Sequence, residues 1–461
     1  MIVDRIFTPS LSQVAYLVAD EAAGLAVVID PRRDVQAYRD WADERGLRIS
    51  AILETHVHAD FVSGGKELSE LTGAPLYASR LGDQAFPHHP LDDGEDIAIG
   101  SLVLRAFWTP GHTPEHMSYL LFDLAQGDDP IAVFTGDALF VGDVGRPDLL
   151  GAARTGELVA QLYPTITQRF ATLPDATLVY PGHTAGSSCG KKIGDAPDST
   201  IGTERRTNYA FQPATAESFA EAVLGNMPPA PTYYPELKRV NKVGPADTAS
   251  LPDGGPLSAA AVKALREDGA LVVDARGPAA FGEGHIPGAI AVGWGPNFLA
   301  WMGWLAPYER DLVFVIDDPE QFADLRLELR RIGLDRVAGY LQGGMEAWHA
   351  AGYPAEMLEQ ASVSDLAARR AEPSPLPVLD VRGDDEWRQG HIGGAEHVFA
   401  GALAQGAEVP FGPDETFAVI CGTGYRSSVA ASLLQARGYT RLINIMGGMT
   451  AWSEAGFPVS A

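Results

Sequence analysis

Short apolar runs alternate with polar, glycine-rich segments over the first half of the chain. Three runs near the N-terminus are separated by turn residues, a pattern that predicts antiparallel strands. Four later runs each lead directly into a polar loop, as buried strands do where they end at the edge of a sheet. Helical segments are expected at residues 34–46 and 66–72, because each is polar and bounded by glycine. The apolar runs span residues 2–7, 14–18, 25–29, 49–53, 102–107, 131–134 and 178–180.

The polar loops after the four later runs carry histidine or aspartate. These residue types are metal ligands in proteins, and loops at one sheet edge can direct several of them at one cation. We therefore expect a metal site at this edge. His88 and His89 lie between prolines and are expected in a surface loop instead. The candidate ligands are His56, His58 and Asp60 in the first loop and His112, Asp137 and His183 in the next three.

The order of these motifs, HxHxD, TPGH, TGD and PGH, resembles the metallo-β-lactamase superfamily over about residues 1–240. The resemblance implies a four-layer αββα sandwich with a metal site at its sheet edges. In the binuclear hydrolases of this superfamily, a second ion needs Asp60, a histidine at the next position and His183. Phe61 occupies that next position, and a phenyl ring cannot coordinate a metal. The second site is therefore expected to be vestigial.

The remaining set is His56, His112 and Asp137. Two histidines and one carboxylate with open positions are the arrangement associated with mononuclear non-haem Fe(II). His58 as a fourth ligand would favour zinc, so the ligands alone leave the identity of the metal open.

The second half of the chain repeats itself. The segment DAR at residue 274 returns as DVR at residue 380, and GGMEAW at residue 343 returns as GGMTAW at residue 447. Each copy alternates apolar runs with amphipathic segments, which is typical of a parallel sheet covered by helices. The motifs DVR, GHIxGA and GGMxAW resemble the rhodanese (sulfurtransferase) family. We expect a metallo-β-lactamase-like domain over residues 1–245, followed by rhodanese-like α/β domains over residues 257–355 and 362–461.

In the second copy, an apolar run ends at Cys421 and a helix follows. Backbone N–H groups of a glycine-rich loop at a helix N-terminus stabilise a thiolate, and Arg426 adds positive charge. Cys421 and Arg426 are therefore the expected catalytic residues, and the rhodanese resemblance implies a cysteine persulfide. The intervening loop residues, expected to bind substrate, are Gly422, Thr423, Gly424 and Tyr425.

The first copy lacks this chemistry. Counting back from the GGM motif, Asp317 takes the place of Cys421 and Phe322 the place of Arg426. We expect the middle domain to be inactive. Its insertion with Trp294, Phe298, Trp301 and Trp304 fits either an interface or ordinary core packing.

Composition narrows the choice of partners and compartment. A net charge of −26 and a pI near 4.7 disfavour nucleic acid and anionic membrane surfaces as partners. Two cysteines form no disulfide framework and fit a reducing compartment. Charged residues at positions 4 and 5 interrupt any signal-peptide core, so the expectation is a cytoplasmic protein. We also expect a homo-oligomer, either a dimer or a tetramer.

Together, the two resemblances imply a persulfide dioxygenase fused to an inactive and an active rhodanese domain. Such a protein would use one Fe(II) per chain to oxidise a low-molecular-weight thiol persulfide with O₂ to sulfite. The active rhodanese would convert sulfite to thiosulfate. Together, the two reactions would detoxify sulfide. The resemblance also implies that Arg146 contacts the thiol carrier. Cys189 is expected either to line the same pocket or to be structural.

Two other functions stay open at this point. One is a zinc-dependent thioester hydrolase of the glyoxalase II type with an attached sulfurtransferase, which Phe61 disfavours. The other is a sulfur-relay protein that delivers persulfide to Cys421 without oxidising it.

Overall fold

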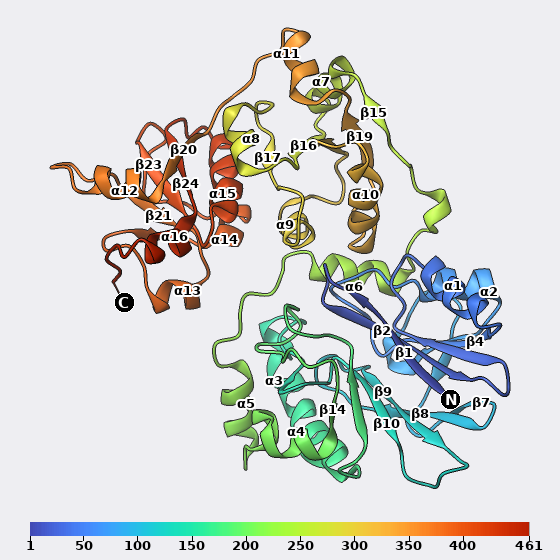
Figure 1. Ribbon diagram of the computed structural model, residues 1–461. Helices are drawn as coiled ribbons and strands as arrows, with labels where there is room; N and C mark the ends of the chain where they lie inside the picture. The colour runs from blue at the N-terminus through green and yellow to red at the C-terminus, as the bar shows by residue number, and fades with distance from the viewer. Residues whose placement is uncertain (461) are drawn as a thin grey trace. The chain divides into compact units, whose positions relative to one another are not determined.

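The computed structural model describes residues 1–460, which fall into two compact units. The first unit comprises Met1–Leu251 with Leu327–Gly333, and the second comprises Pro252–Arg326 with the chain from Leu334 onward. Figure 1 colours the first unit mainly blue to green and the second yellow to red. Within residues 1–460, no helix is long and apolar enough to cross a membrane.

Two six-stranded sheets form the centre of the first unit. The strands β1 to β3 pair antiparallel as predicted, and β3 to β6 continue the sheet in parallel. In sheet order, the first sheet contains β1 (Ile2–Thr8), β2 (Gln13–Asp20), β3 (Leu25–Ile29), β4 (Arg48–Leu53), β5 (Leu76–Ser79) and β6 (His89–Leu91). The second contains β14 (Ser199–Thr200), β13 (Leu178–Pro181), β10 (Ala132–Gly136), β9 (Met117–Asp123), β8 (Leu102–Trp108) and β7 (Asp96–Ile99). A separate hairpin pairs β11 (Leu139–Phe140) with β12 (Asp143–Val144).

One expectation for the first unit was wrong in detail. His89, expected in a surface loop, begins the edge strand β6, because it pairs in parallel with Tyr77 of β5. Its side chain is nevertheless exposed.

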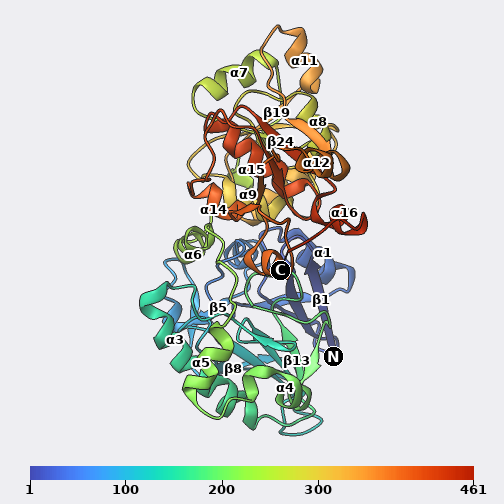
Figure 2. The same ribbon diagram turned by 90° about the vertical axis from the view of Figure 1, so that its left-hand side faces the viewer.

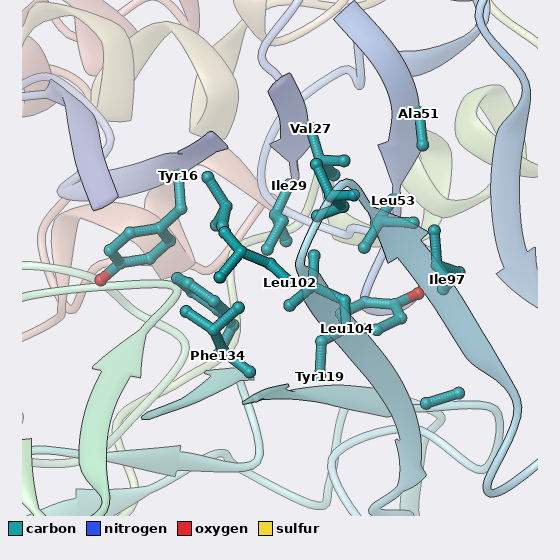
Figure 3. Packing of buried hydrophobic residues seen from close by; sticks show 14 of the residues in the cluster. Tyr16, Val27, Ile29, Ala51, Leu53, Ile97, Leu102, Leu104, Tyr119 and Phe134 are labelled. Atoms are coloured by element: carbon teal, nitrogen blue, oxygen red, sulfur yellow. The ribbon is translucent and has the colours of Figure 1, made fainter. Parts of the chain in front are cut away.

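The main core lies between the two sheets. Strand β2 shows how the sequence builds it, since its alternate residues point to opposite faces. Tyr16 packs against Phe134 of the second sheet, with ring centroids 5.1 Å apart, while the neighbouring Leu17 belongs to the cluster on the outer face. Figure 3 shows side chains from both sheets meeting in this layer. Because both of its faces are covered, β2 is buried along its whole length.

Helices cover the outer faces of both sheets and complete four layers. Helices α1 (Gln36–Glu44) and α2 (Gly65–Thr72) pack Tyr38, Trp41 and Leu68 against the first sheet. Helices α3 and α5 pack against the second sheet. The predicted αββα sandwich is thereby confirmed. The other helices of this unit are α3 (Ala152–Pro164), α4 (Ile201–Thr207), α5 (Ala216–Leu224) and α6 (Tyr234–Val243).

The second unit contains two five-stranded parallel sheets. Their strand orders are equivalent, as the sequence repeat predicts. The first contains β15 (Pro256–Leu257), β19 (Val337–Leu341), β18 (Leu312–Val315), β16 (Leu271–Asp274) and β17 (Ile290–Ala291). The second contains β20 (Glu359–Ser362), β24 (Leu442–Met446), β23 (Phe417–Ile420), β21 (Val378–Asp380) and β22 (Glu396–His397).

Helices flank both of these sheets, and Figure 2 shows α15 alongside β24. With the first sheet are α7 (Ala259–Glu267), α8 (Pro278–Glu283), α9 (Phe298–Leu305), α10 (Gln321–Arg331) and α11 (Gly344–Ala350). With the second are α12 (Val363–Arg370), α13 (Asp384–Gln389), α14 (Ala400–Ala404), α15 (Tyr425–Ala436) and α16 (Gly448–Glu454).

The aromatic insertion in the first repeat serves both of the purposes considered above. Phe298 and Trp301 are buried in their own module. Trp304 instead packs edge-on against Phe399 of the second repeat, with ring centroids 5.7 Å apart.

Candidate functional site

Three side chains converge at one edge of the sandwich, each from the loop that follows a different strand. His56 follows β4, His112 follows β8 and Asp137 follows β10. Asp137 Oδ2 lies 3.9 Å from His56 Nε2 and 3.6 Å from His112 Nε2. A single ion with ligand bonds of about 2.1 Å can bridge such distances.

These same three atoms are buried without a hydrogen-bond partner among the described residues. Buried polar atoms are almost always paired, so three orphaned lone pairs facing one another are best explained by a cation. The donor set therefore fits a metal ion held by His56, His112 and Asp137.

Neighbouring groups fix both histidines in the form that binds metal. His112 Nδ1–H donates to the carbonyl oxygen of Arg146 at 3.0 Å, which leaves Nε2 with a free lone pair. Thr55 Oγ1 gives its proton to Asp30, so it accepts from His56 Nδ1–H at 2.9 Å. Burial also lowers the pKa of both His56 and His112, which keeps the rings neutral. Such outer contacts set the tautomer of a ligating histidine.

The other oxygen of Asp137 is held by His183. His183 Nδ1 lies 2.7 Å from Asp137 Oδ1, and its Nε2 lies 2.7 Å from Asp60 Oδ2. Although burial opposes a charge on the ring, the two carboxylates raise the pKa of His183 to about 10. With a proton on each ring nitrogen, His183 donates to both carboxylates and orients Asp137. That the second metal site is vestigial stays a prediction.

His58 does not join the three converging residues. Its Nε2 lies 3.1 Å from Glu54 Oε2 and 3.2 Å from Asp30 Oδ1. Against the effect of burial, these carboxylates raise the pKa of His58 well above its usual value. His58 Nδ1 is also buried without a hydrogen-bond partner, but His58 groups with Asp30 and Glu54 and not with the three converging residues. A fourth ligand from His58, which would favour zinc, stays a prediction. Phe61 is fully buried beside it, with ring centroids 4.2 Å apart.

The structure gives Arg146 a different place from the one that the resemblance implied. Its side chain is 1% exposed, and its guanidinium binds Asp148 Oδ1 at 2.7 Å and the carbonyl oxygens of Ser188 and Pro228. Its Nη2 also binds Asp148 Oδ2 at 2.8 Å, so four of the five N–H groups of the guanidinium are used within the protein. Arg146 instead positions the ring of His112 through its own carbonyl group.

Cys189 lies beside the site but is not exposed. Together with Asp60 and His183 it forms a compact buried group, and its Sγ lies 3.8 Å from the hydroxyl of Tyr234. Burial raises the pKa of the Cys189 thiol well above its usual value, so the thiol is protonated at neutral pH.

A cavity of about 860 Å³ opens next to the converging residues. Val57, directly after His56, forms part of its wall, as do Pro114 and Glu115, which closely follow His112. Helix α6 supplies another wall, including Tyr234 and Lys238. The cavity is large enough for a small organic molecule, and residues close in sequence to both histidines line it, although the histidines themselves do not.

The second unit carries the cysteine loop as expected. Cys421 is fully buried at the end of β23, and its Sγ accepts a hydrogen bond of 3.1 Å from Gly424 N–H. Gly424 has a φ of 101°, a conformation that glycine adopts without strain. Gly422 lines a cavity of about 340 Å³ together with Arg382 and Glu386.

Arg426 does not project freely into this loop. Its guanidinium binds Glu386 of α13, with Nη2 and Oε1 2.6 Å apart. The equivalent positions in the first repeat are Ala280 and Phe322, so that copy lacks the ion pair as well as the cysteine. By contrast, the ion pair within the DAR and DVR motifs is present in both copies, as Asp274 with Arg276 and as Asp380 with Arg382. A pair that both copies share does not distinguish the two modules.

The middle module contacts the cysteine loop directly. The hydroxyl of Tyr425 donates to the carbonyl oxygen of Gly293 at 2.9 Å. On the helix that follows the loop, Ser432 Oγ accepts from Ala291 N–H at 3.0 Å. A Cβ at position 293 would lie 3.1 Å from the backbone carbonyl oxygen of Arg276 and 3.3 Å from Tyr425 Cε2, both tight contacts, so a glycine fits best there.

Comparisons with known proteins agree with this architecture. The family model described as "Metallo-beta-lactamase superfamily" matches residues 9–183, and the "Rhodanese-like domain" model matches residues 258–351 and 362–455. Persulfide dioxygenase ETHE1 of Homo sapiens is 35% identical over 233 residues, covering 48% of this chain and 80% of that protein. The chain belongs to the metallo-β-lactamase superfamily. Both resemblances seen in the sequence are thus confirmed.

Other superfamily members are similar over different shares of their length. The Bos taurus persulfide dioxygenase ETHE1 is 36% identical over 187 residues, which cover 39% of this chain and 66% of that protein. A crystal structure of a metallo-beta-lactamase from Staphylococcus aureus subsp. aureus COL is 33% identical with a TM-score of 0.67, covering 74% of this chain and 98% of that chain. That similarity extends beyond the superfamily domain.

Three functional contacts escaped sequence reasoning. Asn241 of α6 binds the carbonyl oxygens of His58 and Phe61 and thereby fixes the loop of the first motif. Lys238 and Glu386 belong to the cavity walls. The sequence alone could have indicated Glu386. Like Cys421 and Arg426, it is replaced at the equivalent position of the first repeat, in its case by Ala280.

Proposed function

We propose that the first domain is a mononuclear non-haem iron persulfide dioxygenase coupled to sulfur transfer at Cys421. The observation that carries this proposal is the set of three orphaned ligand atoms on His56, His112 and Asp137, with Phe61 in place of a histidine for a second ion. Similarity to persulfide dioxygenases over the same domain supports it.

One Fe(II) per chain would be held by these three residues and would supply the redox chemistry that activates O₂. The overall reaction joins one thiol persulfide, one O₂ and one water to give one thiol, one sulfite and two protons. The outer sulfur loses four electrons and O₂ gains four, so no other reductant is needed.

The chain's own residues prepare this site. His183 holds Asp137 in place with its charge retained, while Arg146 holds the ring of His112. The cavity beside Val57 and Pro114 would take the thiol carrier, with its sulfur end towards the two histidines.

The second step would use the sulfite. A second thiol persulfide would transfer its outer sulfur to the Cys421 thiolate and leave as the thiol. Sulfite would then attack the outer sulfur of the Cys421 persulfide, the sulfur–sulfur bond would break, and thiosulfate would be released while the thiolate of Cys421 is regenerated. Backbone N–H groups of the loop, such as that of Gly424, would stabilise the sulfur as negative charge returns to it.

The test is metal analysis after anaerobic loading, followed by O₂ uptake with glutathione persulfide. We expect about one iron per chain and O₂ consumption that requires the persulfide. Two tightly bound zinc ions per chain without O₂ uptake would favour the thioester hydrolase instead. Iron binding without O₂ uptake would favour the sulfur relay.

A further inference from the structure

The cavity next to the metal ligands has mainly apolar walls and one unusual cation. Helix α6 carries Lys238 along one wall, and the side chain is half-buried there. Apolar residues around the cavity include Val57, Leu81, Pro114, Leu149, Leu150 and Pro231.

Four cationic side chains line this cavity, and three of them are already neutralised. Arg154 binds Glu157 at 2.7 Å, Arg239 binds Glu236 at 2.6 Å, and Lys242 binds Asp83 at 3.0 Å. The partner carboxylates compete with any ligand for these charges.

Lys238 differs from the other three. Among residues 1–460 its ammonium has no hydrogen-bond partner and no carboxylate within ion-pair distance. The carboxylate of Glu115, which also lines the cavity, favours the charged form of Lys238. One oxygen of this carboxylate already accepts a hydrogen bond from the N–H of Val57. A half-buried ammonium without a partner costs free energy, which an anionic ligand would recover.

The position of Lys238 also fits a substrate that reaches the metal. Lys238 lines the same cavity as Val57, which directly follows His56, and Pro114, which lies two residues after His112. A molecule that binds Lys238 by one end can present its other end towards the two histidines.

We propose that Lys238 binds the anionic group of the thiol carrier and selects thiols that bear a carboxylate or phosphate. The inference rests on the proposed function and adds its specificity-determining residue. The ammonium would donate charge-assisted hydrogen bonds to the anion, and the apolar walls would contact the carrier's carbon chain. Thiols without an anionic group would lose this contact and bind weakly.

The test measures binding without turnover. Glutathione, coenzyme A and cysteamine are titrated calorimetrically into the metal-loaded, full-length protein, first wild type and then Lys238→Met. We expect the variant to bind the anionic thiol about 10- to 100-fold more weakly, as for loss of a hydrogen bond to a charged group. Cysteamine, which has neither carboxylate nor phosphate, should bind equally weakly to both proteins. Lys238→Arg should retain most of the affinity.

The matched control is Arg206→Met, which removes one charge from an exposed site on α4, away from the cavity. This variant should bind all three thiols with the affinity of the wild type. Loss for glutathione alone identifies a carboxylate as the anion, and loss for coenzyme A alone identifies a phosphate. Unchanged affinity of Lys238→Met for both, or an equal loss for cysteamine, would overturn the inference, as would a wild-type protein that binds neither anionic thiol.

Failure of this inference can be told apart from failure of the proposed function. A wild-type protein that binds thiols through Lys238 but consumes no O₂ with their persulfides would refute only the dioxygenase. Persulfide-dependent O₂ uptake with the same KM in wild type and Lys238→Met would refute only the role of Lys238.

Discussion

Replacing His183 by alanine should weaken the metal site without removing it. His183 bridges Asp137 and Asp60 at 2.7 Å on each side but gives no lone pair to the ion. Loss of a residue that orients a ligand typically lowers metal affinity about 10- to 100-fold, or about 1.4–2.7 kcal/mol. Loss of His112, a direct ligand, should leave only two protein ligands and no stoichiometric metal.

The same substitution should also destabilise the metal-free protein. It leaves two buried carboxylates facing each other without the shared cation, and removal of one member of a buried ion pair costs about 3–5 kcal/mol. His183→Gln keeps one hydrogen bond and should lie between wild type and alanine in both respects.

Anaerobic iron titrations against a competing chelator, with thermal unfolding of the metal-free proteins, measure both effects. The ligand assignment is refuted if His183→Ala loses iron as completely as His112→Ala. It is equally refuted if His183→Ala binds iron as tightly as wild type while His112→Ala still holds one iron per chain.

Four further experiments examine the cysteine loop, the middle module and the pH dependence of the metal site. Cys421→Ser should keep O₂ uptake but accumulate sulfite in place of thiosulfate. Ion chromatography measures both anions, with a correction for the spontaneous reaction of sulfite with persulfide. An unchanged yield of thiosulfate would show that the cysteine is not coupled to the iron site. The same variant should lose all cyanide-dependent sulfur transfer, because Asp317 leaves the middle module without a thiol, and residual transfer would show that this module is active. Tyr425→Phe should lower the kcat/KM of sulfur transfer about 5-fold, which is the effect of one hydrogen bond of ~1 kcal/mol. The rate of O₂ uptake should not change. Equal kcat/KM values for sulfur transfer in the variant and the wild type would show that the bond to Gly293 does not position the loop. Since burial lowers the pKa of His112, protons should compete with metal only well below the ordinary histidine pKa of about 6.5, and iron loss already at pH 6.5 in equilibrium dialysis would contradict this.

The sequence predicted the sandwich and the repeat because both depend on local patterns. Apolar runs mark the buried strands, and the residues directly after β4, β8 and β10 meet at one edge because the strands end there. For this reason the sequence alone groups His56, His112 and Asp137 at one site.

The contacts that tune the site could not be predicted in the same way. They join side chains far apart in the chain, such as His183 to Asp60 and Arg426 to Glu386. The contacts of Arg146 with Asp148 and two backbone carbonyl groups could not be foreseen, because a motif fixes a residue's place along the chain but not the direction of its side chain. Lys238 had no motif at all, and its significance appears only when the partners of its neighbours are known.

The hydrogen bond from Tyr425 to Gly293 ties the cysteine loop of the second repeat to the backbone of the first. The first repeat has no thiol at the position that matches Cys421, yet it contributes a contact to the loop that carries this cysteine. We expect a mutation at Gly293 to reduce sulfur transfer while leaving Cys421 and its immediate neighbours intact. In a protein with repeated modules, one module can therefore affect a reaction through the support that it gives to a loop of the other.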